Sequence, residues 1–318
     1  MKVAIAFDDV EARDATPDER GVLDSVRAVE GALARLGHQP QRVPVSGDIF
    51  AWLTALHGAL PAVVFNLCEG IAGRSELEPH FAAVVELLGI AITGSGAATL
   101  ALARRKDRVN AILDAASQPV PAWTLVPNGH APGGWTHYPA IVKPAAEDGS
   151  VGMDAGSVAR SLPELERAIA RARRWAPLLV QSYVHGRELN VAFVGREPLP
   201  ISEIVFTVAA GAWPIVDYRA KWVSGSDEEH ATPVRCPAPL DGRDATRVLA
   251  AARAAWQAVG GRGYGRVDLR LDPDGGVHIL EVNPNPDLAP DAGLARAAGI
   301  AGWNHDELIA RILTEAVR

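Results

Sequence analysis

The sequence predicts an α/β protein built from three lobes. Its 318 residues are too many for one simple hydrophobic core. In the first hundred residues, short apolar runs alternate with amphipathic helical stretches, which is typical of a parallel sheet covered by helices. The rest combines strand patterns with isolated helices and predicts two α+β lobes. We expect the lobes to span residues 1–98, 99–184 and 185–318.

The first lobe shows its elements in a regular order. The stretch "KVAIAF" predicts a first strand, and the short apolar run of "MKVAIAFDDVEA" argues against a signal peptide. The elements expected after it are a helix over 21–38, a strand over 62–67, a helix over 78–90 and a short strand over 91–93. The lobe should end near "TGSGAATLALARRKD".

The second and third lobes follow after a Pro-rich link over 117–135. The second lobe should contain a strand over 139–144, a Gly-containing loop over 145–153, a helix over 162–175 and a strand over 177–184. The third should contain a strand over 186–195, a long polar stretch over 218–240, a helix over 243–260 and a hairpin over 266–286.

Composition and charge exclude several classes of protein. The net charge of -7 provides no basic surface for nucleic acid or an anionic membrane. No apolar run approaches the roughly 20 residues that span a bilayer. Cys68 and Cys236 offer neither a disulfide framework nor the spacing of a zinc site, so we expect a cytoplasmic protein.

The hairpin "RVDLRLDPDGGVHILEVNPNP" carries polar side chains on one face. Asp268 alternates with apolar residues on the first strand, and Glu281 and Asn283 share a face of the second. Acids on paired strands need a cation or a salt bridge. Their hard oxygen atoms suit Mg²⁺ with phosphate oxygens completing its shell. The alternative is structural: Asp268 pairs with Arg266 or Arg270, and Asn283 caps the turn.

A second motif is the loop "KPAAEDGSVGM". Lys143 ends a strand, and the Gly149 to Gly152 segment can present backbone N–H groups and a hydroxyl to a polyphosphate. It is no Walker motif, because the lysine precedes the glycines. The alternative is a solvated turn. Lys106 and Lys221, taken singly, resemble surface lysines.

The stretch "VQSYVHGRELNVAF" has the pattern of a strand, a hinge and a second strand. Backbone groups from Gln181 to Val184 can pair with an adenine edge, and Glu188 can accept hydrogen bonds from ribose hydroxyls. The alternative for Glu188 is an exposed strand residue. Cys68 is interpreted as a small buried side chain and His230 as a solvated one.

The order of these parts resembles the ATP-grasp superfamily and, within it, the D-alanine:D-alanine ligase family. The resemblance begins at "ELLGIAITGSG" and is strongest over "YGRVDLRLDPDGGVHILEVNPNPD". It implies an ATP-grasp fold of three lobes. It also implies an enzyme that uses ATP to convert a carboxylate into an acyl phosphate, which an amine then attacks to give an amide, ADP and phosphate.

The resemblance also assigns roles to residues. It implies that Lys106 and Lys143 contact ATP phosphates, that Ser150 faces them, and that Lys221 closes over the γ-phosphate and substrate. It implies that Asp268, Glu281 and Asn283 hold two Mg²⁺ ions, which Mn²⁺ can replace, and that Arg266 steadies the transition state. The remaining nucleotide-binding residues it implies are Glu147, Val151, Gln181, Tyr183, Val184 and Glu188.

Departures from the family cluster at the amino-acid site. The N-terminal signature is replaced by "AFDDVEARD", and the His-Gly and Glu-Asp-Gly signature by "NLCEGIAGRSELEP". Gly149 stands where the family has the first of two serines, and Trp222 where it usually has Tyr. The candidate substrate residues are Glu11, Glu69, Arg74, Glu78, Gly149, Trp222 and Asn285.

We therefore expect a carboxylate-amine ligase that acts on an amino acid or small peptide other than D-alanine alone. The alternatives are an authentic D-alanine:D-alanine ligase, an inactive ATP-binding regulatory module, and a kinase-like enzyme that phosphorylates without joining an amine. The expected partners are small molecules, without nucleic acid or membrane. Because the family is often dimeric, a homodimer is also expected.

Overall fold

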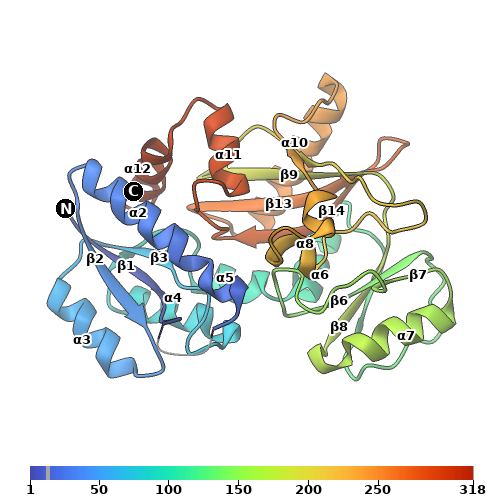
Figure 1. Cartoon of the computed structure of the whole chain (residues 1–318), viewed down its shortest axis with the longest axis horizontal. Coiled ribbons are helices and arrows are strands. Elements are labelled where there is room, and N and C mark those ends of the chain that lie inside the picture. The colour runs from blue at the N-terminus through green and yellow to red at the C-terminus, as the bar shows by residue number, and fades with distance from the viewer. Residues whose placement is uncertain (12–14, 318) are drawn as a thin grey trace.

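The computed structural model describes residues 1–11 and 15–317, so the end of the "AFDDVEARD" stretch lies outside the described residues. Figure 1 shows three lobes, with the N-terminal lobe on the left, the central lobe at the lower right and the C-terminal lobe between and above them. One parallel sheet and two antiparallel sheets confirm the mixed α/β class.

The N-terminal lobe is a parallel sheet of order β2-β1-β3-β4. Its strands are β1 Lys2–Asp8, β2 Gln39–Val45, β3 Val63–Leu67 and β4 Ala91–Ile92. The flanking helices are α1 Pro17–Arg20, α2 Val22–Arg35, α3 Ile49–Ala59, α4 Glu78–Leu87 and α5 Ala97–Ala103, with a 3-10 turn at Ser75–Leu77.

Sequence patterns in this lobe explain both the expected and the unexpected elements. Helix α2 was expected because Val22, Val26 and Val29 fall on one face, and all three are buried. Strand β2 and helix α3 were not expected. Strand β2 carries two prolines, which a sheet tolerates at its edge, where β2 lies. Asp48 caps α3 by accepting a hydrogen bond from the Ala51 N–H.

The central lobe is an antiparallel sheet of order β5-β8-β6-β7. Its strands are β5 Trp123–Val126, β6 Ala140–Pro144, β7 Val158–Ala159 and β8 Leu178–Ser182. Helix α7, Leu162–Ala172, covers this sheet and is followed by a 3-10 turn at Arg173–Trp175. The Pro-rich link of the sequence contains β5. Helix α6, Lys106–Ala115, buries Val109 and Leu113 in the core beneath the C-terminal sheet.

The C-terminal lobe has a six-stranded antiparallel sheet of order β12-β11-β9-β13-β14, with β10 paired to β9. The strands are β9 Arg187–Val194, β10 Glu197–Pro198, β11 Ser202–Ile204, β12 Val234–Arg235, β13 Tyr264–Leu271 and β14 Val277–Pro284. Helix α10, Gly242–Ala258, covers one face and buries Trp256 there. The expected hairpin is therefore confirmed as β13 and β14.

The long polar stretch forms two short helices, α8 Tyr218–Trp222 and α9 Asp227–His230, capped by Asp217 and Ser226. The last helices are α11 Gly293–Ile300 and α12 His305–Ala316. Helix α12 packs against α2 of the N-terminal lobe, so both chain ends lie on the same side of the molecule (Figure 1).

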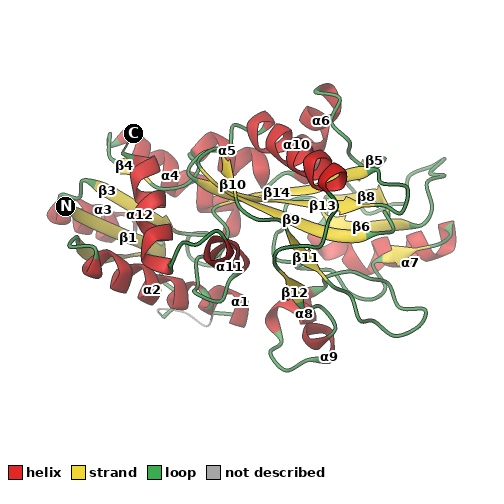
Figure 2. Cartoon of the chain, turned by 90° about the horizontal axis from the view of Figure 1, so that it is seen from above, coloured by secondary structure: helices red, strands yellow, loops and turns green. Residues whose placement is uncertain are grey.

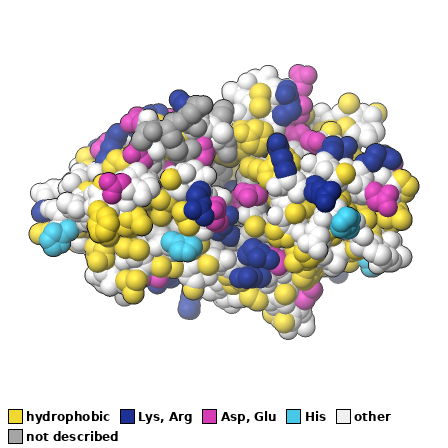
Figure 3. Space-filling model, turned by 90° about the horizontal axis from the view of Figure 1, so that it is seen from below, with side chains coloured by type: hydrophobic (Ala, Val, Ile, Leu, Met, Phe, Trp, Pro, Cys, Tyr) yellow, Lys and Arg dark blue, Asp and Glu magenta, His cyan; other side chains and the backbone are white. Residues whose placement is uncertain are grey.

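The outer surface mixes charges of both signs. Figure 3 shows basic and acidic side chains interspersed with hydrophobic ones on the face seen from below. Within residues 1–11 and 15–317, no helix combines the length and apolar character that a membrane span requires.

Candidate active site

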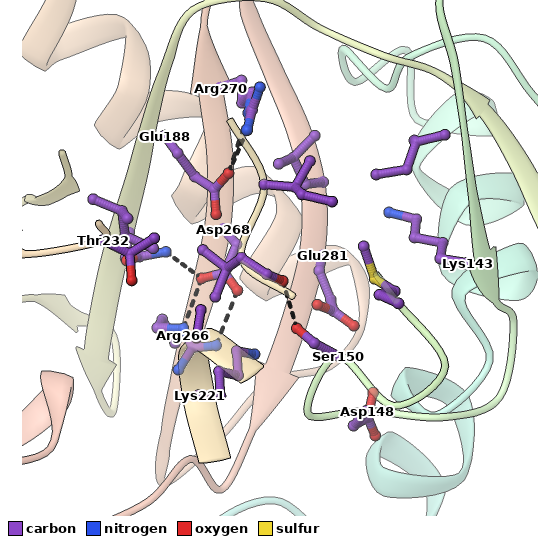
Figure 4. A pocket seen from close by; sticks show the side chains of 18 of the residues that line it. Lys143, Asp148, Ser150, Glu188, Lys221, Thr232, Arg266, Asp268, Arg270 and Glu281 are labelled. Atoms are coloured by element: carbon purple, nitrogen blue, oxygen red, sulfur yellow. Dashed lines mark hydrogen bonds and ion pairs between the residues drawn. The ribbon is translucent and has the colours of Figure 1, made fainter. Parts of the chain in front are cut away.

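A cavity of about 430 Å³ lies between the open face of the C-terminal sheet and the central lobe. Figure 2 shows the loops around β11, β12 and α8 projecting beside these sheets. Figure 4 shows side chains from several elements pointing into the cavity. The predicted residues that line it are Lys106, Lys143, Glu147, Ser150, Val151, Gln181, Tyr183, Val184, Glu188, Lys221, Arg266, Asp268 and Glu281.

Strand register arranges the polar side chains of the C-terminal sheet in rows. Glu188 of β9 pairs with Arg270 of β13 in one row. The next row contains Asn190, Asp268 and Glu281. The third contains Ala192, Arg266 and Asn283. Successive rows are two residues apart, or about 7 Å. The cavity floor therefore presents different chemistry at three positions.

Asp268 is held by four hydrogen bonds from three side chains. Arg266 donates from Nε at 2.6 Å and from Nη2 at 2.9 Å. Asn190 and Asn283 donate their amide N–H groups at 2.7 and 2.9 Å. The pairing of Asp268 with Arg266, which the sequence offered as a structural alternative to metal binding, is thus present, and it lies inside the cavity.

Lys106 lies at the centre of a second charged group. Its ammonium is 2.6 Å from the Glu281 carboxylate and 2.8 Å from that of Asp148, and the residue is only 7% exposed. Burial alone would lower the pKa of Lys106, but these two anions outweigh burial and raise it. Burial would raise the pKa of Glu281, but the neighbouring Lys106, Lys143 and Lys221 lower it.

Lys143 is also buried, at 8% exposure. Loss of hydration lowers its pKa to about 8, Glu281 opposes this, and the positive charge of Lys106 adds to the lowering. Lys221 faces the same cavity but is more exposed than the other two lysines, and partial loss of hydration together with the Arg266 guanidinium lowers its pKa. The three lysines form a site suited to a strongly negative group such as a polyphosphate.

The glycine loop contacts both α8 and the segment that precedes it. The Ser150 hydroxyl donates to the Val216 carbonyl at 2.8 Å, and the Trp222 indole N–H donates to the Gly149 carbonyl at 2.8 Å. Gly152 has a φ of +76°, and a Cβ atom there would lie 2.8 Å from the Trp175 ring. Gly152 is therefore required by both backbone conformation and space.

Arg270 organises the hinge, and the sequence pattern alone did not select it as a site residue. It is 3% exposed, and its Nη2 lies 2.7 Å from Glu188. Its Nη1 donates to the Val184 carbonyl at 2.7 Å, and its Nη2 also bonds the Pro214 carbonyl, which accepts from the Tyr183 hydroxyl too. A signal was available in the sequence: Arg270 is two residues from Asp268 and four from Arg266, so the three side chains share one face of the strand.

Gln181, also predicted for the hinge, is 1% exposed and lines the cavity. Its Nε2 is buried without a hydrogen-bond partner among the described residues. A buried donor of this kind is stabilised when a ligand supplies an acceptor.

The donor atoms on the hairpin fit a hard cation. Glu281 and Asp268 are cross-strand partners, and Asn283 contributes an amide oxygen one row away. In the described part of the chain, no three His, Cys, Asp or Glu side chains are arranged to hold a metal alone. Magnesium commonly uses one or two carboxylates and takes its other ligands from water or phosphate. Asp268, Glu281 and Asn283 fit that pattern.

Three predicted substrate residues line a second cavity of about 20 Å³ between the N-terminal lobe and the end of β14. They are Glu69, Glu78 and Asn285. Burial raises the pKa of Glu78, and the nearby Asp148 and Glu69 add to the shift. The Asn285 side-chain oxygen accepts a hydrogen bond from the Ser95 N–H at 2.8 Å.

The other predicted residues lie outside both cavities. Glu11 is exposed, and Arg74 is exposed and pairs with Glu76 at 2.7 Å. Gly149 and Trp222 contact each other at the cavity rim, and Asn283 is connected to the main cavity through Asp268. The structure thus assembles the predicted nucleotide and metal residues, but it divides the substrate candidates among the second cavity, the rim of the main cavity and the surface.

Comparison with known proteins identifies the family of this chain. Residues 130–314, more than half of the chain, match the family described as "D-ala D-ala ligase C-terminus". A D-alanine–D-alanine ligase from Gluconobacter oxydans is 31% identical over 100% of this chain and 99% of its own. One from Halorhodospira halophila is 34% identical over 80% of each chain.

The fold is also found in a solved structure. The D-alanine–D-alanine ligase from Bacillus anthracis, crystallised in complex with ATP, superposes with a TM-score of 0.81 at 17% identity and covers 100% of this chain and 98% of its own. The chain belongs to the D-alanine–D-alanine ligase family, whose members are ATP-grasp enzymes that use ATP to form carbon–nitrogen bonds.

Proposed function

We propose that this protein binds ATP and Mg²⁺ and joins a carboxylate to an amine through an acyl phosphate, with release of ADP and phosphate. The observation that carries the proposal is the meeting of Lys106, Lys143, Asp268 and Glu281 in one cavity. Phosphoryl transfer from ATP depends mainly on positioning and charge neutralisation, and this set supplies both.

The residues have separate tasks in this proposal. The buried Lys106 and Lys143 neutralise phosphate oxygens, while Glu188 accepts from the ribose and Gln181 donates to the adenine. The substrate carboxylate attacks the γ-phosphorus and ADP leaves. Lys221 remains paired with the γ-phosphate during this transfer. Arg266 stabilises the negative charge that develops when the amine attacks the acyl carbon and phosphate departs with its electron pair. The amine proton is released to solvent.

Asp268, Glu281 and Asn283 are proposed to hold two Mg²⁺ ions, or Mn²⁺ in their place. These ions would neutralise the transferring phosphate oxygens. Before binding them, Glu281 must release Lys106 and Asp268 must release part of its contact with Arg266. The freed lysine and arginine can then face the phosphates and the substrate.

We further propose that the substrate is an amino acid or small peptide other than D-alanine alone. The support is at the rim, where Gly149 and Trp222 replace the serine and tyrosine expected from the family, and the Trp222 N–H is already bonded to the Gly149 carbonyl. An authentic D-alanine–D-alanine ligase is the second candidate, favoured by the names of the relatives.

An inactive regulatory module and a kinase-like enzyme receive less support. A module that only binds ATP has no need for Arg266, which we assign to the acyl-transfer step, yet Arg266 lines the cavity beside Asp268 and Glu281. A kinase-like enzyme would work without an amine. We also propose a cytoplasmic location, consistent with the free thiols Cys68 and Cys236, and a homodimer by analogy with the family.

The test is turnover of ATP with D- and L-amino acids, singly and in pairs, followed by separation of nucleotides and products. ADP, phosphate and an amide are expected, with unlike substrates outperforming D-alanine. AMP and pyrophosphate would refute the acyl-phosphate route. ADP release without a second, amine-bearing substrate, together with a phosphorylated product, would show a kinase.

A further inference from the structure

Arg270 is a buried cation to which the proposed reaction gives no task. It lines the main cavity beside Glu188, yet it is only 3% exposed. Its Nε and Nη2 both donate to Oε2 of Glu188, at 3.2 and 2.7 Å. No described group donates to Oε1 of Glu188, so this oxygen is left for a ribose hydroxyl. In Figure 4, Glu188 lies between Arg270 and Asp268.

The same guanidinium also holds two backbone carbonyls. Nη1 of Arg270 donates to the Val184 carbonyl at 2.7 Å, and Nη2 donates to the Pro214 carbonyl. The Arg270 Cζ atom lies 4.9 Å from the centre of the Tyr183 ring and 5.5 Å from that of Phe206. Because a guanidinium is planar and its N–H groups have fixed directions, its three acceptors do not shift independently of one another.

Pro214 belongs to the segment that carries Lys221. We call residues 213–222 the strap. Lys221 follows Pro214 by seven residues and lies on the short helix α8 at the end of the strap. The buried Asp217 caps this helix by accepting a hydrogen bond from the Ala220 N–H at 3.0 Å. The position of Lys221 in the cavity therefore depends on where Pro214 is held.

We propose that Arg270 is a positioning residue that couples recognition of the ribose to the placement of Lys221. A ribose hydroxyl that donates to Oε1 of Glu188 fixes this carboxylate and, with it, the Arg270 guanidinium. The guanidinium then holds the strap at Pro214, and Lys221 stays over the γ-phosphate. This inference rests on the proposed function, because it takes ATP as the ligand. It adds that the ribose contributes to the rate of phosphoryl transfer as well as to affinity.

The kinetic experiment replaces ATP by 2′-deoxy-ATP and 3′-deoxy-ATP, with the best substrate pair of the panel. Removal of the hydroxyl that binds Glu188 should lower the wild-type kcat by about 10-fold or more, the range for a hydrogen bond to a charged group. In R270K a cation remains beside Glu188, but an ammonium does not hold three acceptors in one plane. The kcat of R270K with ATP should therefore fall, and its ratio to the kcat with the deoxy nucleotide should approach unity.

Y183F is the matched control for a purely structural effect. The Tyr183 hydroxyl donates to the same Pro214 carbonyl, at 2.9 Å, but no hydrogen bond joins it to Glu188. Loss of this anchor should change kcat with ATP and with the deoxy nucleotides alike, so the wild-type ratio should be retained. If Arg270 only supports the fold, R270K should behave as Y183F does. The unfolding midpoint in urea verifies that both variants are folded.

A binding arm does not depend on turnover. Hydrogen exchange of the backbone N–H groups of residues 215–222 is measured by mass spectrometry at saturating ADP, 2′-deoxy-ADP or 3′-deoxy-ADP. In the wild-type protein, ADP should slow this exchange more than the deoxy nucleotide that lacks the Glu188 contact. R270K should lose the difference, and Y183F should keep it.

Three results would overturn the assignment of Arg270. They are equal protection of the strap by ADP and both deoxy nucleotides, a deoxy effect confined to KM, and a wild-type kcat ratio in R270K. Failure of the ligase proposal is distinguishable from these. If the exchange difference is present and depends on Arg270 but no substrate pair yields an amide, the coupling stands and the ligase proposal fails.

Discussion

The ammonium of Lys106 lies 2.6 Å from the carboxylate of Glu281, and this ion pair joins the first residue of α6 to strand β14. In this structure a side chain therefore occupies the place that we assign to a metal ion. The two charges are far apart in the sequence but neutralise each other in the fold. In our proposal, binding of nucleotide and cation therefore replaces Lys106 by a metal ion as the partner of Glu281.

This exchange makes Glu281 the first residue to test. E281Q should lower kcat by about 10²-fold or more, because the amide is a poor ligand for a cation beside the transferring phosphate. Folding should change little, since Lys106 keeps Asp148 as a partner. Steady-state ADP release and the unfolding midpoint in urea measure the two effects. E197Q, on exposed β10, is the control. Wild-type turnover by E281Q would show that the hairpin has only a structural role.

Asn283 and Asn190 form a matched pair. Each donates one amide N–H to Asp268, but only Asn283 is proposed as a metal ligand. N283A should lower turnover by about 10²-fold or more and raise the Mg²⁺ concentration needed for half-maximal rate. N190A should leave the Mg²⁺ dependence nearly unchanged. If the two variants have the same Mg²⁺ dependence, Asn283 orients Asp268 and is not a metal ligand.

The lowered pKa of Lys143 predicts that nucleotide binding depends on pH. Its pKa of about 8 means that the free protein loses this charge as pH rises through that value. The dissociation constant for ADP should therefore increase between about pH 7 and pH 9.5, by up to about 10-fold. K143M should bind ADP more weakly at all pH values and lose this dependence. A wild-type profile that is flat over this range contradicts the assignment.

The same lowered pKa affects stability, with a definite sign. In the unfolded chain Lys143 titrates near pH 10.4, so between about pH 8 and pH 10.4 the unfolded state binds more protons. Lys143 therefore destabilises the fold when charged, and its contribution to the free energy of unfolding rises with pH over this window. Urea unfolding of K143M should lack that rise, whereas the same rise in K143M would assign it to another group.

Arg270 should be important for stability as well as for the hinge. R270M leaves the Glu188 carboxylate and the Val184 carbonyl without their buried partner, whereas the Pro214 carbonyl keeps the Tyr183 hydroxyl. Breaking a buried pair from one side costs about 3–5 kcal/mol. Chemical denaturation should show a loss of this order. The double variant E188Q/R270M should recover part of it, and no recovery would indicate that the carbonyl contacts dominate.

Substrate choice can be tested at the rim. In G149S/W222Y the two hydroxyls usual in the family are restored, and D-alanine turnover should increase by about 10-fold or more over wild type. A serine at position 149 must adopt a φ near +63°, a strain on the order of 1 kcal/mol, so the single variants are needed as controls. If wild type already makes D-alanyl-D-alanine as its best product, the substrate proposal is wrong.

The sequence by itself determined the fold class and the parts of the proposed nucleotide site. The hairpin of β13 and β14 was predictable because alternation and a Gly-containing turn are local properties, and alternation also put Asp268, Glu281 and Asn283 on one face. The proline-bearing strand β2 and the strand β5 in the Pro-rich link were not expected, because pairing with neighbouring strands decided their conformation.

Only the tertiary structure decided which charges meet. Lys106, with no local feature to distinguish it from a surface lysine, is buried between Asp148 and Glu281, and Arg270 bonds both Glu188 and the hinge backbone. Glu11 and Arg74, which the resemblance offered as substrate candidates, remain at the surface. Ion pairing depends on distance in space and loss of water, and neither is encoded in the spacing of residues along the chain.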